Sequence, residues 1–382
     1  MTLDCETLRR HPLGPLAAQI LQAALDAVDT RSLVRAWAAS TLTEAGPIRV
    51  LALGKAAAAM TEGLRDAVGE RLVGGVAVLK HPASLAGVRV VLGDHPVPSA
   101  RSLGAGAALL EGAAAASGPE TVVALVSGGA SALVEAPAEG VTLEHIVAHT
   151  QARLRDATPI EALNAQRRAM SRIKGGGLAR AVPSGIPIHV AVLSDVVGAD
   201  MHTVGSGPFD DPRAQGHLLA DNDTAVRAAA AAATAAGAEV EIVPPLCGEA
   251  RIEGVRFAQA RMDAPTTDAV RVTLAGGETV VTVRGEGRGG RNQELALAAA
   301  PALMGNPHAL LATMATDGED GPTDAAGAVV DGTTITRALE RGLDPGEFLR
   351  RNDAYTLFDA LGDLLRPGPT GTNVCDVTLA IS

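Results

Sequence analysis

Apolar and polar positions along this chain alternate between the period of strands and the period of helices. Short apolar runs predict buried strands at residues 48–53, 75–79, 122–127, 188–193, 240–243, 310–315 and 377–381. Amphipathic or alanine-rich segments predict helices at residues 16–37, 56–68, 99–116, 143–154, 160–171, 225–236 and 291–300. Strands that alternate with helices are typical of a parallel sheet with helices on both faces. The first part of the chain therefore predicts a doubly wound, Rossmann-like α/β sheet.

The C-terminal part has a different pattern. Two strand-like segments, 270–275 and 279–283, are joined by Gly276-Gly277, which favours a β-hairpin and hence a mixed sheet. A chain of 382 residues fits two hydrophobic cores better than one. We expect a Rossmann-like N-terminal domain over residues 1–245 and a smaller C-terminal α/β domain over residues 246–382.

Composition and charge narrow the class of protein. Hydrophobic residues make up 47% of the chain but aromatic residues only 2%, so the core must consist mainly of Ala, Val and Leu. A net charge of −11 argues against nucleic acid as a partner, and no apolar run is long enough to span a membrane. The N-terminus lacks a signal-peptide pattern, and the three cysteines are widely separated without a CxxC pair. These features predict a cytoplasmic protein with a small-molecule ligand.

A serine-glycine loop follows the apolar run 122–127. It consists of Ser127, Gly128, Gly129, Ala130 and Ser131. Backbone N–H groups and hydroxyls at the carboxyl end of a buried strand are typical of sites for phosphate or carboxylate. We expect this loop to bind a nucleotide or phosphate, although such turns also serve as plain connectors.

Two further segments carry cations beside small residues. Lys55 stands between the strand 48–53 and an alanine-rich helix, where it adds a positive charge to the helix N-terminus; the alternative is a solvated lysine. Arg172 and Lys174 precede the glycine run 175–177 and are candidate ligands for a substrate carboxylate; the alternative is a flexible linker.

Two aspartates directly follow predicted strands. Asp195 comes just after the strand 188–193. Asp317 comes just after the strand 310–315, within a carboxylate-rich loop. A carboxylate in such a place suits a magnesium ligand or a base for a substrate hydroxyl, and Asp195 could equally cap a turn. We favour Asp195 as the base, because Arg172 and Lys174 lie upstream of its strand, and Asp317 as the metal ligand.

The segment 285–294 combines glycines with arginines. Its glycines satisfy GxGxxG, but the preceding strand belongs to the expected hairpin and no acidic residue follows at the spacing of a dinucleotide site. Arginines at a helix start suit phosphoryl oxygens better. The candidate residues are Gly289, Gly290, Arg291, Asn292 and, for the substrate, Glu294. The chain has neither a Walker loop nor a GxSxG elbow.

The order of its short motifs resembles the bacterial and archaeal class of glycerate 2-kinases, the MOFRL family, some members of which are called hydroxypyruvate reductases. The resemblance covers most of the chain. It depends on Gly54-Lys-Ala-Ala57, Gly93-Asp-His-Pro96, Ser127-Gly-Gly-Ala-Ser-Ala-Leu133, Ser171-Arg-Ile-Lys-Gly-Gly176, Ser194-Asp-Val196, Ser206-Gly-Pro208, Gly289-Gly-Arg-Asn-Gln-Glu294, Thr316-Asp-Gly318, Asp320-Gly-Pro-Thr-Asp324 and Gly368-Pro-Thr-Gly-Thr-Asn-Val374.

This resemblance implies a Rossmann-like domain, a smaller C-terminal domain and an ATP·Mg²⁺ site in the cleft between them. It maps the essential lysine and arginine of the family onto Lys55 and Arg291. The implied reaction is phosphorylation of the 2-hydroxyl of D-glycerate by a monomer or homodimer. The alternatives are an NAD(P)H-dependent hydroxypyruvate reductase, a diverged member acting on another hydroxy acid, and a binding protein without activity.

The chain departs from the pattern of the family at several positions. The run Gly198-Ala-Asp-Met201 replaces the usual Gly-Asp-Asp-Pro, and Phe209 replaces a threonine. Ala169 replaces a common histidine, and Cys375 replaces a frequent asparagine. We expect these departures to border the substrate site and to affect which substrate is preferred.

Overall fold

The computed structural model describes residues 3–153, 166–196, 198, 201–262 and 269–382. The chain forms two compact units. The parallel-sheet unit comprises residues 29–221 and 371–373, and the mixed-sheet unit comprises residues 1–28, 222–370 and 374–382. The first half of the helix expected at 160–171 lies outside the described residues, as does Ala199.

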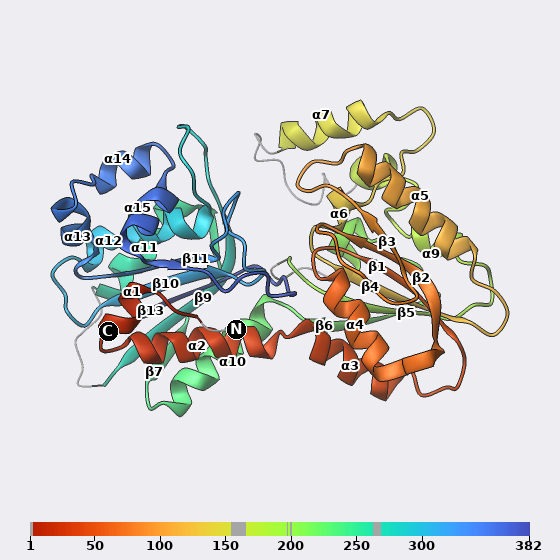
Figure 1. Ribbon diagram of the computed structural model, residues 1–382, viewed down its shortest axis with the longest axis horizontal. Coiled ribbons are helices and arrows are strands. Elements are labelled where there is room, and N and C mark those ends of the chain that lie inside the picture. The colour runs from red at the N-terminus through yellow and green to blue at the C-terminus, as the bar shows by residue number, and fades with distance from the viewer. Residues whose placement is uncertain (1–2, 154–165, 197, 199–200, 263–268) are drawn as a thin grey trace. The chain divides into compact units, whose positions relative to one another are not determined.

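The parallel-sheet unit contains a six-stranded sheet in the order β3-β2-β1-β4-β5-β6, and all paired neighbours are parallel. Its strands are β1 (Ile48–Leu53), β2 (Leu72–Leu79), β3 (Arg89–Leu92), β4 (Thr121–Ser127), β5 (Ile188–Leu193) and β6 (Ala214–Ala220). Its α-helices are α3 (Thr30–Thr41), α4 (Ala57–Val68), α5 (Ala100–Ala114), α6 (Ala130–Leu133), α7 (Leu143–Arg153) and α9 (Gly177–Ala181). Helices α3 and α4 lie on one face of the sheet and α5 and α9 on the other (Figure 1). The prediction of a doubly wound, Rossmann-like sheet is confirmed.

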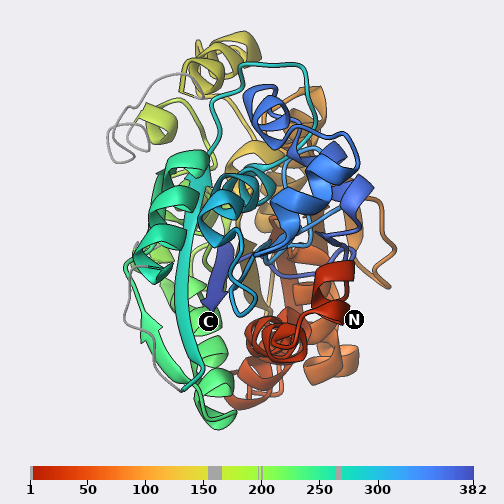
Figure 2. The same cartoon turned by 90° about the vertical axis from the view of Figure 1, so that its left-hand side faces the viewer.

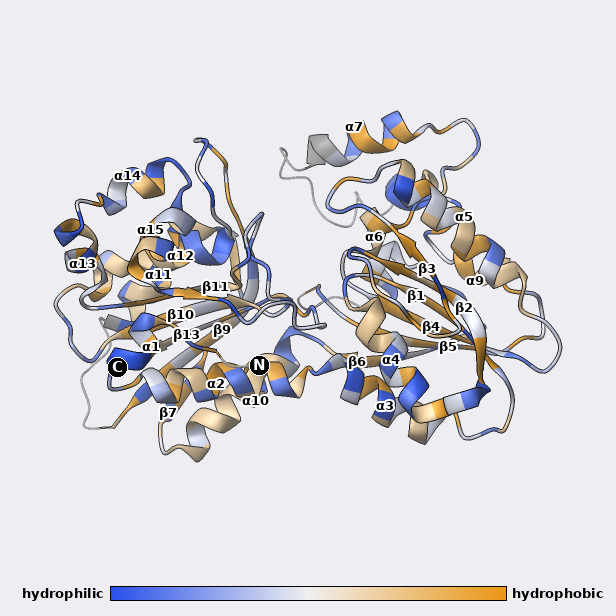
Figure 3. Cartoon of the chain, viewed as in Figure 1, coloured by the Kyte–Doolittle hydropathy of each residue, from blue (hydrophilic) through white to orange (hydrophobic). Residues whose placement is uncertain are grey.

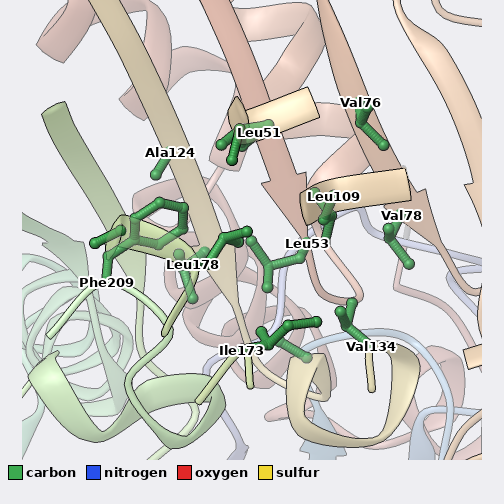
Figure 4. Close-up of a cluster of buried hydrophobic side chains, with 14 of the residues drawn as sticks. Leu51, Leu53, Val76, Val78, Leu109, Ala124, Val134, Ile173, Leu178 and Phe209 are labelled. Carbon is green, nitrogen blue, oxygen red and sulfur yellow. The ribbon is translucent and has the colours of Figure 1, made fainter. Parts of the chain in front are cut away.

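The core of this unit is built from medium-sized aliphatic side chains, as the composition predicts. Leu53, Leu109, Ile173 and Leu178 are buried between the sheet and its helices (Figure 4). The strands are coloured mainly as hydrophobic, whereas the surrounding helices carry polar patches (Figure 3). Burial on both faces explains why the central strands have nearly continuous apolar sequences.

The mixed-sheet unit contains a seven-stranded sheet in the order β12-β11-β10-β13-β9-β7, and β8 also pairs with β9. Its strands are β7 (Glu239–Ile242), β8 (Leu246–Glu249), β9 (Arg271–Val280), β10 (Leu310–Ala315), β11 (Gly327–Asp331), β12 (Leu364–Leu365) and β13 (Asp376–Ile381). Strands β7 and β8 run parallel to β9, and the other pairs are antiparallel. The expected mixed sheet is therefore present.

Helices cover both faces of this second sheet. They are α1 (Glu6–Arg10), α2 (Gly14–Ala27), α10 (Asn222–Ala235), α11 (Ala250–Met262), α12 (Arg291–Leu303), α13 (Thr334–Glu340), α14 (Pro345–Arg350) and α15 (Ala354–Leu361). Helix α11 lies alongside β9 and packs on α12 (Figure 2). Within the described residues, no helix has both the length and the apolar character needed to cross a membrane.

The expected hairpin at Gly276-Gly277 is wrong, because both glycines lie inside the long strand β9. A Cβ atom on Gly277, whose φ is +136°, would lie 2.2 Å from the carbonyl oxygen of Leu246 in β8. A Cβ on Gly276 would lie 1.7 Å from Oδ1 of Asn222 in α10. These glycines allow close packing of neighbouring elements, a role that Gly in a strand also serves.

The division into units differs from the expected boundary at residues 245 and 246. Residues 1–28 and 222–245 belong to the mixed-sheet unit. Helix α10 packs against β9 and β13, α2 packs against α10, and β7 pairs with β9. Local periodicity shows that these helices exist but not which sheet they cover, so the sequence pattern did not reveal this arrangement.

Candidate active site

The carboxyl ends of β1 and β4 mark the point where the strand order of the parallel sheet reverses, which is where α/β folds bind ligands. The N–H of Lys55 donates to the carbonyl of Gly128 (2.9 Å), and the N–H of Ala56 donates to Oγ of Ser127 (3.0 Å). A Cβ on Gly54, with φ +122°, would lie 2.2 Å from that same Oγ. The lysine loop and the serine-glycine loop are therefore joined.

Ser127 itself is fully buried, and its hydroxyl accepts a bond from the backbone of the neighbouring loop. This hydroxyl holds the two loops together, so the structure gives it a supporting position and not the ligand-binding position that the sequence predicted. The partly exposed members of the serine-glycine loop are Gly129 and Ser131, whereas Gly128 and Ala130 are buried.

Gly129 lies between two side chains that carry proton-donating groups. A Cβ on Gly129 would lie 3.2 Å from Cδ2 of His95 and 3.2 Å from Cγ of Lys55. Since Gly129 has a φ of +80°, only glycine adopts this conformation easily. The side chains of Lys55 and His95 therefore flank a glycine backbone at the switch point, and residues of these types suit phosphoryl oxygens.

Asp195 and Asn373 converge over the neighbouring glycine. Nδ2 of Asn373 lies 3.5 Å from Oδ2 of Asp195, and a Cβ on Gly128 would lie 2.0 Å from Oδ2 of Asp195 and 2.4 Å from Nδ2 of Asn373. The structure thus brings the predicted aspartate to the serine-glycine loop. It also adds Asn373, which lies in the short segment 371–373 that belongs to this unit.

Ser131 continues the same edge of the sheet. Its Oγ lies 2.8 Å from Oγ of Ser206. Ser206 has a φ of +66° and stands between Gly205 and Gly207, which also have positive φ. A non-glycine residue in this conformation is uncommon and costs energy, so it is worth attention at a candidate site.

Lys174 lines a small cavity together with Ser131, but its charge is already paired. Its ammonium pairs with the carboxylate of Glu135, which also accepts a bond from Oγ of Ser171 (2.5 Å), and both charged side chains are almost fully buried. Burial lowers the pKa of Lys174, and the charge of Glu135 opposes that effect. Arg172 is exposed. The buried pair with Glu135 therefore supports a structural position for Lys174, whereas the side chain of Arg172 is exposed.

We predict that Lys174→Met lowers the free energy of unfolding by about 3–5 kcal/mol, because it leaves Glu135 buried without its cation. Urea unfolding monitored by circular dichroism measures this loss. The double variant Glu135→Leu with Lys174→Met should recover much of it, since apolar pairs often replace buried ion pairs well. Loss of substrate affinity in a stable double variant would restore the predicted binding role of Lys174.

In the mixed-sheet unit, Arg291 is the first residue of α12. Its guanidinium donates two bonds to Asp376, Nε to Oδ2 (2.6 Å) and Nη2 to Oδ1 (2.8 Å), and its Nη1 lies 3.3 Å from Oε1 of Glu278. Burial acts to lower the pKa of Arg291, but the carboxylates of Asp376 and Glu278 outweigh it and the net pKa is raised. The guanidinium is thus permanently charged, fixed in direction and about a quarter exposed (27%).

Asp320, which is distant in the sequence, caps the N-terminus of α12. Its carboxyl group accepts bonds from the N–H groups of Asn292 (3.1 Å) and Gln293 (2.8 Å). Burial raises the pKa of Asp320 to about 7, against the effect of these donors and of Arg291. The side chain of Asn292 bonds Asp320 and Thr313, so it supports the loop and does not face a nucleotide as predicted.

Glu294 is buried as well. One of its oxygens accepts from Arg251 (2.8 Å) and the other from Asn352 (2.8 Å). Both oxygens are therefore engaged inside the unit, and the structure favours a structural role over the predicted contact with substrate.

The GxGxxG pattern folds against its own chain. Cβ atoms on Gly285 and Gly287 would lie 2.4 Å from the carbonyl oxygen of Arg351 and from Cβ of Asp353, respectively. The guanidinium of Arg288 lies 4.1 Å above the ring of Tyr355. These glycines allow the approach of the segment 351–355, which agrees with the rejection of a dinucleotide turn. Gly289 and Gly290 are in turn packed against the loop that contains Asp320 and Gly321.

Asp317 lies at the end of β10, as predicted, and its Oδ1 accepts from the N–H of Glu319 (3.1 Å). Within the described residues, no group of three or more His, Cys, Asp or Glu side chains is arranged to hold a metal. The role of Asp317 as a metal ligand stays a prediction.

Among the described residues, the departures from the resemblance differ in burial. Phe209 belongs to the hydrophobic core, and Met201 packs against that core. Cys375 is buried with a φ of +67°, and its Sγ lies 4.0 Å from Oε2 of Glu278, the carboxylate that pairs with Arg291. Ala169 is exposed. Cys375 is therefore the departure next to a candidate residue.

Four residues near the candidate side chains were not singled out from the sequence: His95, Asn373, Asp320 and Asp376. Three of them lie in quoted motifs, 93–96, 320–324 and 368–374, whereas Asp376 follows the last of these motifs. The signal in the sequence that could have identified the residues of these motifs is a polar side chain close to a glycine.

Two family models match successive parts of the chain. The family model described as a domain of unknown function, DUF4147, matches residues 16–240, and the model of the MOFRL family matches residues 271–376. A doubly wound α/β sheet followed by a MOFRL region defines this class of protein.

Similar proteins specify the family. The chain is 34% identical to D-glycerate 2-kinase of Thermotoga maritima over 99% of both chains. The crystal structure of glycerate kinase from Thermotoga maritima aligns with a TM-score of 0.83 at 32% identity, covering 96% of this chain and 98% of that one. An Agrobacterium vitis protein provisionally named hydroxypyruvate reductase is 36% identical over 86% of this chain and 97% of its own. This chain belongs to the glycerate kinase family.

Proposed function

We propose that this protein transfers the γ-phosphoryl group of ATP to the 2-hydroxyl of D-glycerate, giving 2-phosphoglycerate and ADP. The observation that carries the proposal is the position of Lys55, which flanks Gly129 together with His95 at the switch point of the parallel sheet. The full-length similarity to glycerate 2-kinase supports it. Phosphoryl transfer depends mainly on positioning and on positive charge around the phosphoryl oxygens.

The residues fit an anionic ligand at this point. Lys55 supplies a positive charge, Gly129 exposes backbone that a side chain would cover, and Ser131 and Ser206 place two hydroxyls on the same loops. We assign phosphate binding to Lys55 and to the segment 129–131. Ser127 and Gly128 position that segment through their hydrogen bonds to the backbone of Ala56 and Lys55. In the mixed-sheet unit, we assign Arg291 to the phosphoryl group, since its fork is fixed by Asp376.

Mg²⁺ fits this chemistry through the aspartates. Mg²⁺ in proteins is commonly held by one or two carboxylates together with substrate phosphates and water, so no preformed cluster of ligands is required. Asp317 and Asp195 are the candidate carboxylates. When bound, the ion would neutralise charge on the phosphates.

Asp195 is our candidate for the base that accepts the proton of the substrate hydroxyl. Asn373 lies 3.5 Å from its Oδ2, and this contact orients the carboxylate at the serine-glycine loop. We predict that Asp195→Asn lowers kcat at least about 100-fold while ATP binding stays measurable, the scale expected for losing a general base. Asp317→Asn should instead raise the Mg²⁺ concentration needed for half-maximal rate.

Isothermal titration with an ATP analogue, alongside steady-state kinetics, checks both aspartate variants. Retained turnover in Asp195→Asn would remove Asp195 from proton transfer. A loss of nucleotide affinity in Asp195→Asn, together with a loss of turnover only in Asp317→Asn, would reverse the two roles.

A coupled assay tests the function itself. It follows ADP release and NADH oxidation in parallel with D-glycerate, tartronate and hydroxypyruvate as substrates. The proposal expects ADP release that depends on D-glycerate and Mg²⁺ and stops in excess EDTA. NADH oxidation with hydroxypyruvate would instead support the reductase, for which the GxGxxG segment gives no support because it packs against residues 351–355. Activity in excess EDTA would contradict the metal-dependent kinase.

A further inference from the structure

A cavity of about 280 Å³ lies within the mixed-sheet unit, between α11 and the edge of the sheet formed by β7, β8 and β9. Most of its wall is apolar: Val243, Pro244, Leu246, Phe257 and Ala260. Helix α11 and strand β9 are seen side by side in Figure 2. A cavity of this size and lining is typical of sites for small organic molecules.

The unusual member of the wall is Arg261, which is only 7% exposed. Its guanidinium donates to Oγ of Ser382, while its Nε has no hydrogen-bond partner among the residues that the structure describes. Across the same described residues, no carboxylate forms an ion pair with it, in contrast to the partly exposed Arg291 and Arg251, which are both paired. Burying a cation without a counter-charge is costly, so its retention indicates an anion that the wall lacks.

The surroundings of Arg261 do not relieve this cost. Burial lowers the pKa of Arg261, the nearby charge of Arg271 lowers it further, and Glu241 acts in the opposite direction. Arg271 itself pairs with Glu239. An anion placed against Arg261 would therefore gain a charge-assisted hydrogen bond without displacing an existing ion pair.

The charges of the wall indicate the charge of the ligand. Two cations and one carboxylate line the wall, Arg256, Arg261 and Glu241, and of these cations Arg261 is the one without an ion pair among the described residues. Arg256 is mostly exposed and pairs with Glu253, so it contributes at the mouth of the cavity. Glu241 would repel a dianion such as a phosphate monoester more strongly than a single carboxylate, so the wall favours a monoanion.

We propose that this cavity binds a small organic monocarboxylate with an apolar body, its carboxylate on Arg261 and its body against Phe257 and Leu246. Thr273 places a further hydroxyl on the wall. Glu278, which pairs with Arg291, lies five residues after Thr273 along β9, a separation of roughly 16 Å at the rise of a strand. The site is thus separate from the candidate active-site residues, and the proposal does not depend on the function proposed above.

Isothermal titration of the full chain tests this proposal with benzoate and hexanoate as probes. Both acids should bind in the micromolar to millimolar range, with benzyl alcohol and acetate each at least about tenfold weaker, because they lack the charge and the apolar body, respectively. Arg261→Met should weaken benzoate binding by about 10- to 100-fold, the range for losing a charge-assisted bond. Arg227→Met, at an exposed ion pair on α10, is the matched control and should bind benzoate as the native chain does.

The thermal stability of the Arg261→Met variant shows whether Arg261 binds a ligand or supports the fold. A purely structural Arg261 predicts a lower Tm in Arg261→Met, whereas our proposal predicts a Tm equal to or above that of the native chain. Ala260→Phe, which fills the cavity from its rim and leaves Arg261 in place, should also abolish benzoate binding. The proposal is overturned if millimolar benzoate does not bind the native chain, or if it binds Arg261→Met and Ala260→Phe unchanged.

Discussion

Lys55→Met is expected to lower kcat by about 10²- to 10⁴-fold, the range for removing a charge that stabilises a transferring phosphoryl group. The physical reason lies in the position of Lys55. Its N–H donates to Gly128 and its Cγ lies beside Gly129, so the backbone and the stem of this cation are held at the edge of the sheet. Methionine keeps the length and apolar stem of the side chain while removing only the charge.

Steady-state kinetics with D-glycerate and ATP measure this change, and circular dichroism and Tm show whether the fold is kept. Arg89→Met is the matched control, because Arg89 is an exposed cation of the same unit paired with Glu111. It should leave kcat within about twofold, as expected of a surface ion pair. Turnover at the native level in a folded Lys55→Met variant would show that Lys55 takes no part in the chemistry.

The central strands of both sheets could be predicted from sequence, because burial on two faces demands continuous apolar runs such as 48–53, 122–127 and 310–315. Two strands of the parallel sheet escaped notice, β3 and β6. Both are edge strands with many half-exposed positions, and their sequences therefore lack a continuous run. In the parallel sheet, the edge position of these strands, which is a tertiary property, hid them from the sequence. In the mixed sheet the buried interior strand β11 was also missed, whereas the edge strand β7 was predicted.

The candidate site could be predicted only in part for a related reason. Lys55 and Asp195 were found because they directly follow buried strands, and the structure brings both to the serine-glycine loop. Lys174 and Glu294 have the same residue types as binding groups, yet each is buried with a partner from a distant segment, Glu135 and Arg251. The sequence shows which charged residues exist. Whether a charged side chain is available to a ligand depends on whether the fold buries it against a partner.

Arg291→Ala is expected to reduce kcat by about 10³- to 10⁵-fold, the scale for an arginine that stabilises a transferring phosphoryl group. Arg291→Lys should remain at least about 100-fold impaired, because an ammonium cannot reproduce the planar fork that Asp376 holds with two parallel hydrogen bonds. Kinetics of both variants, with Tm as the measure of folding, check this expectation.

A structural ion pair would give a different pattern from a catalytic arginine. If Arg291 served only to satisfy Asp376 and Glu278, Arg291→Lys would lower Tm and leave kcat of the folded fraction near its native value. Arg288→Lys provides the comparison within the same loop, since Arg288 stacks on Tyr355 and should tolerate the change with little loss of turnover. A native-like kcat in folded Arg291→Lys would therefore assign Arg291 to the support of α12 and leave Lys55 as the principal cation of the proposed reaction.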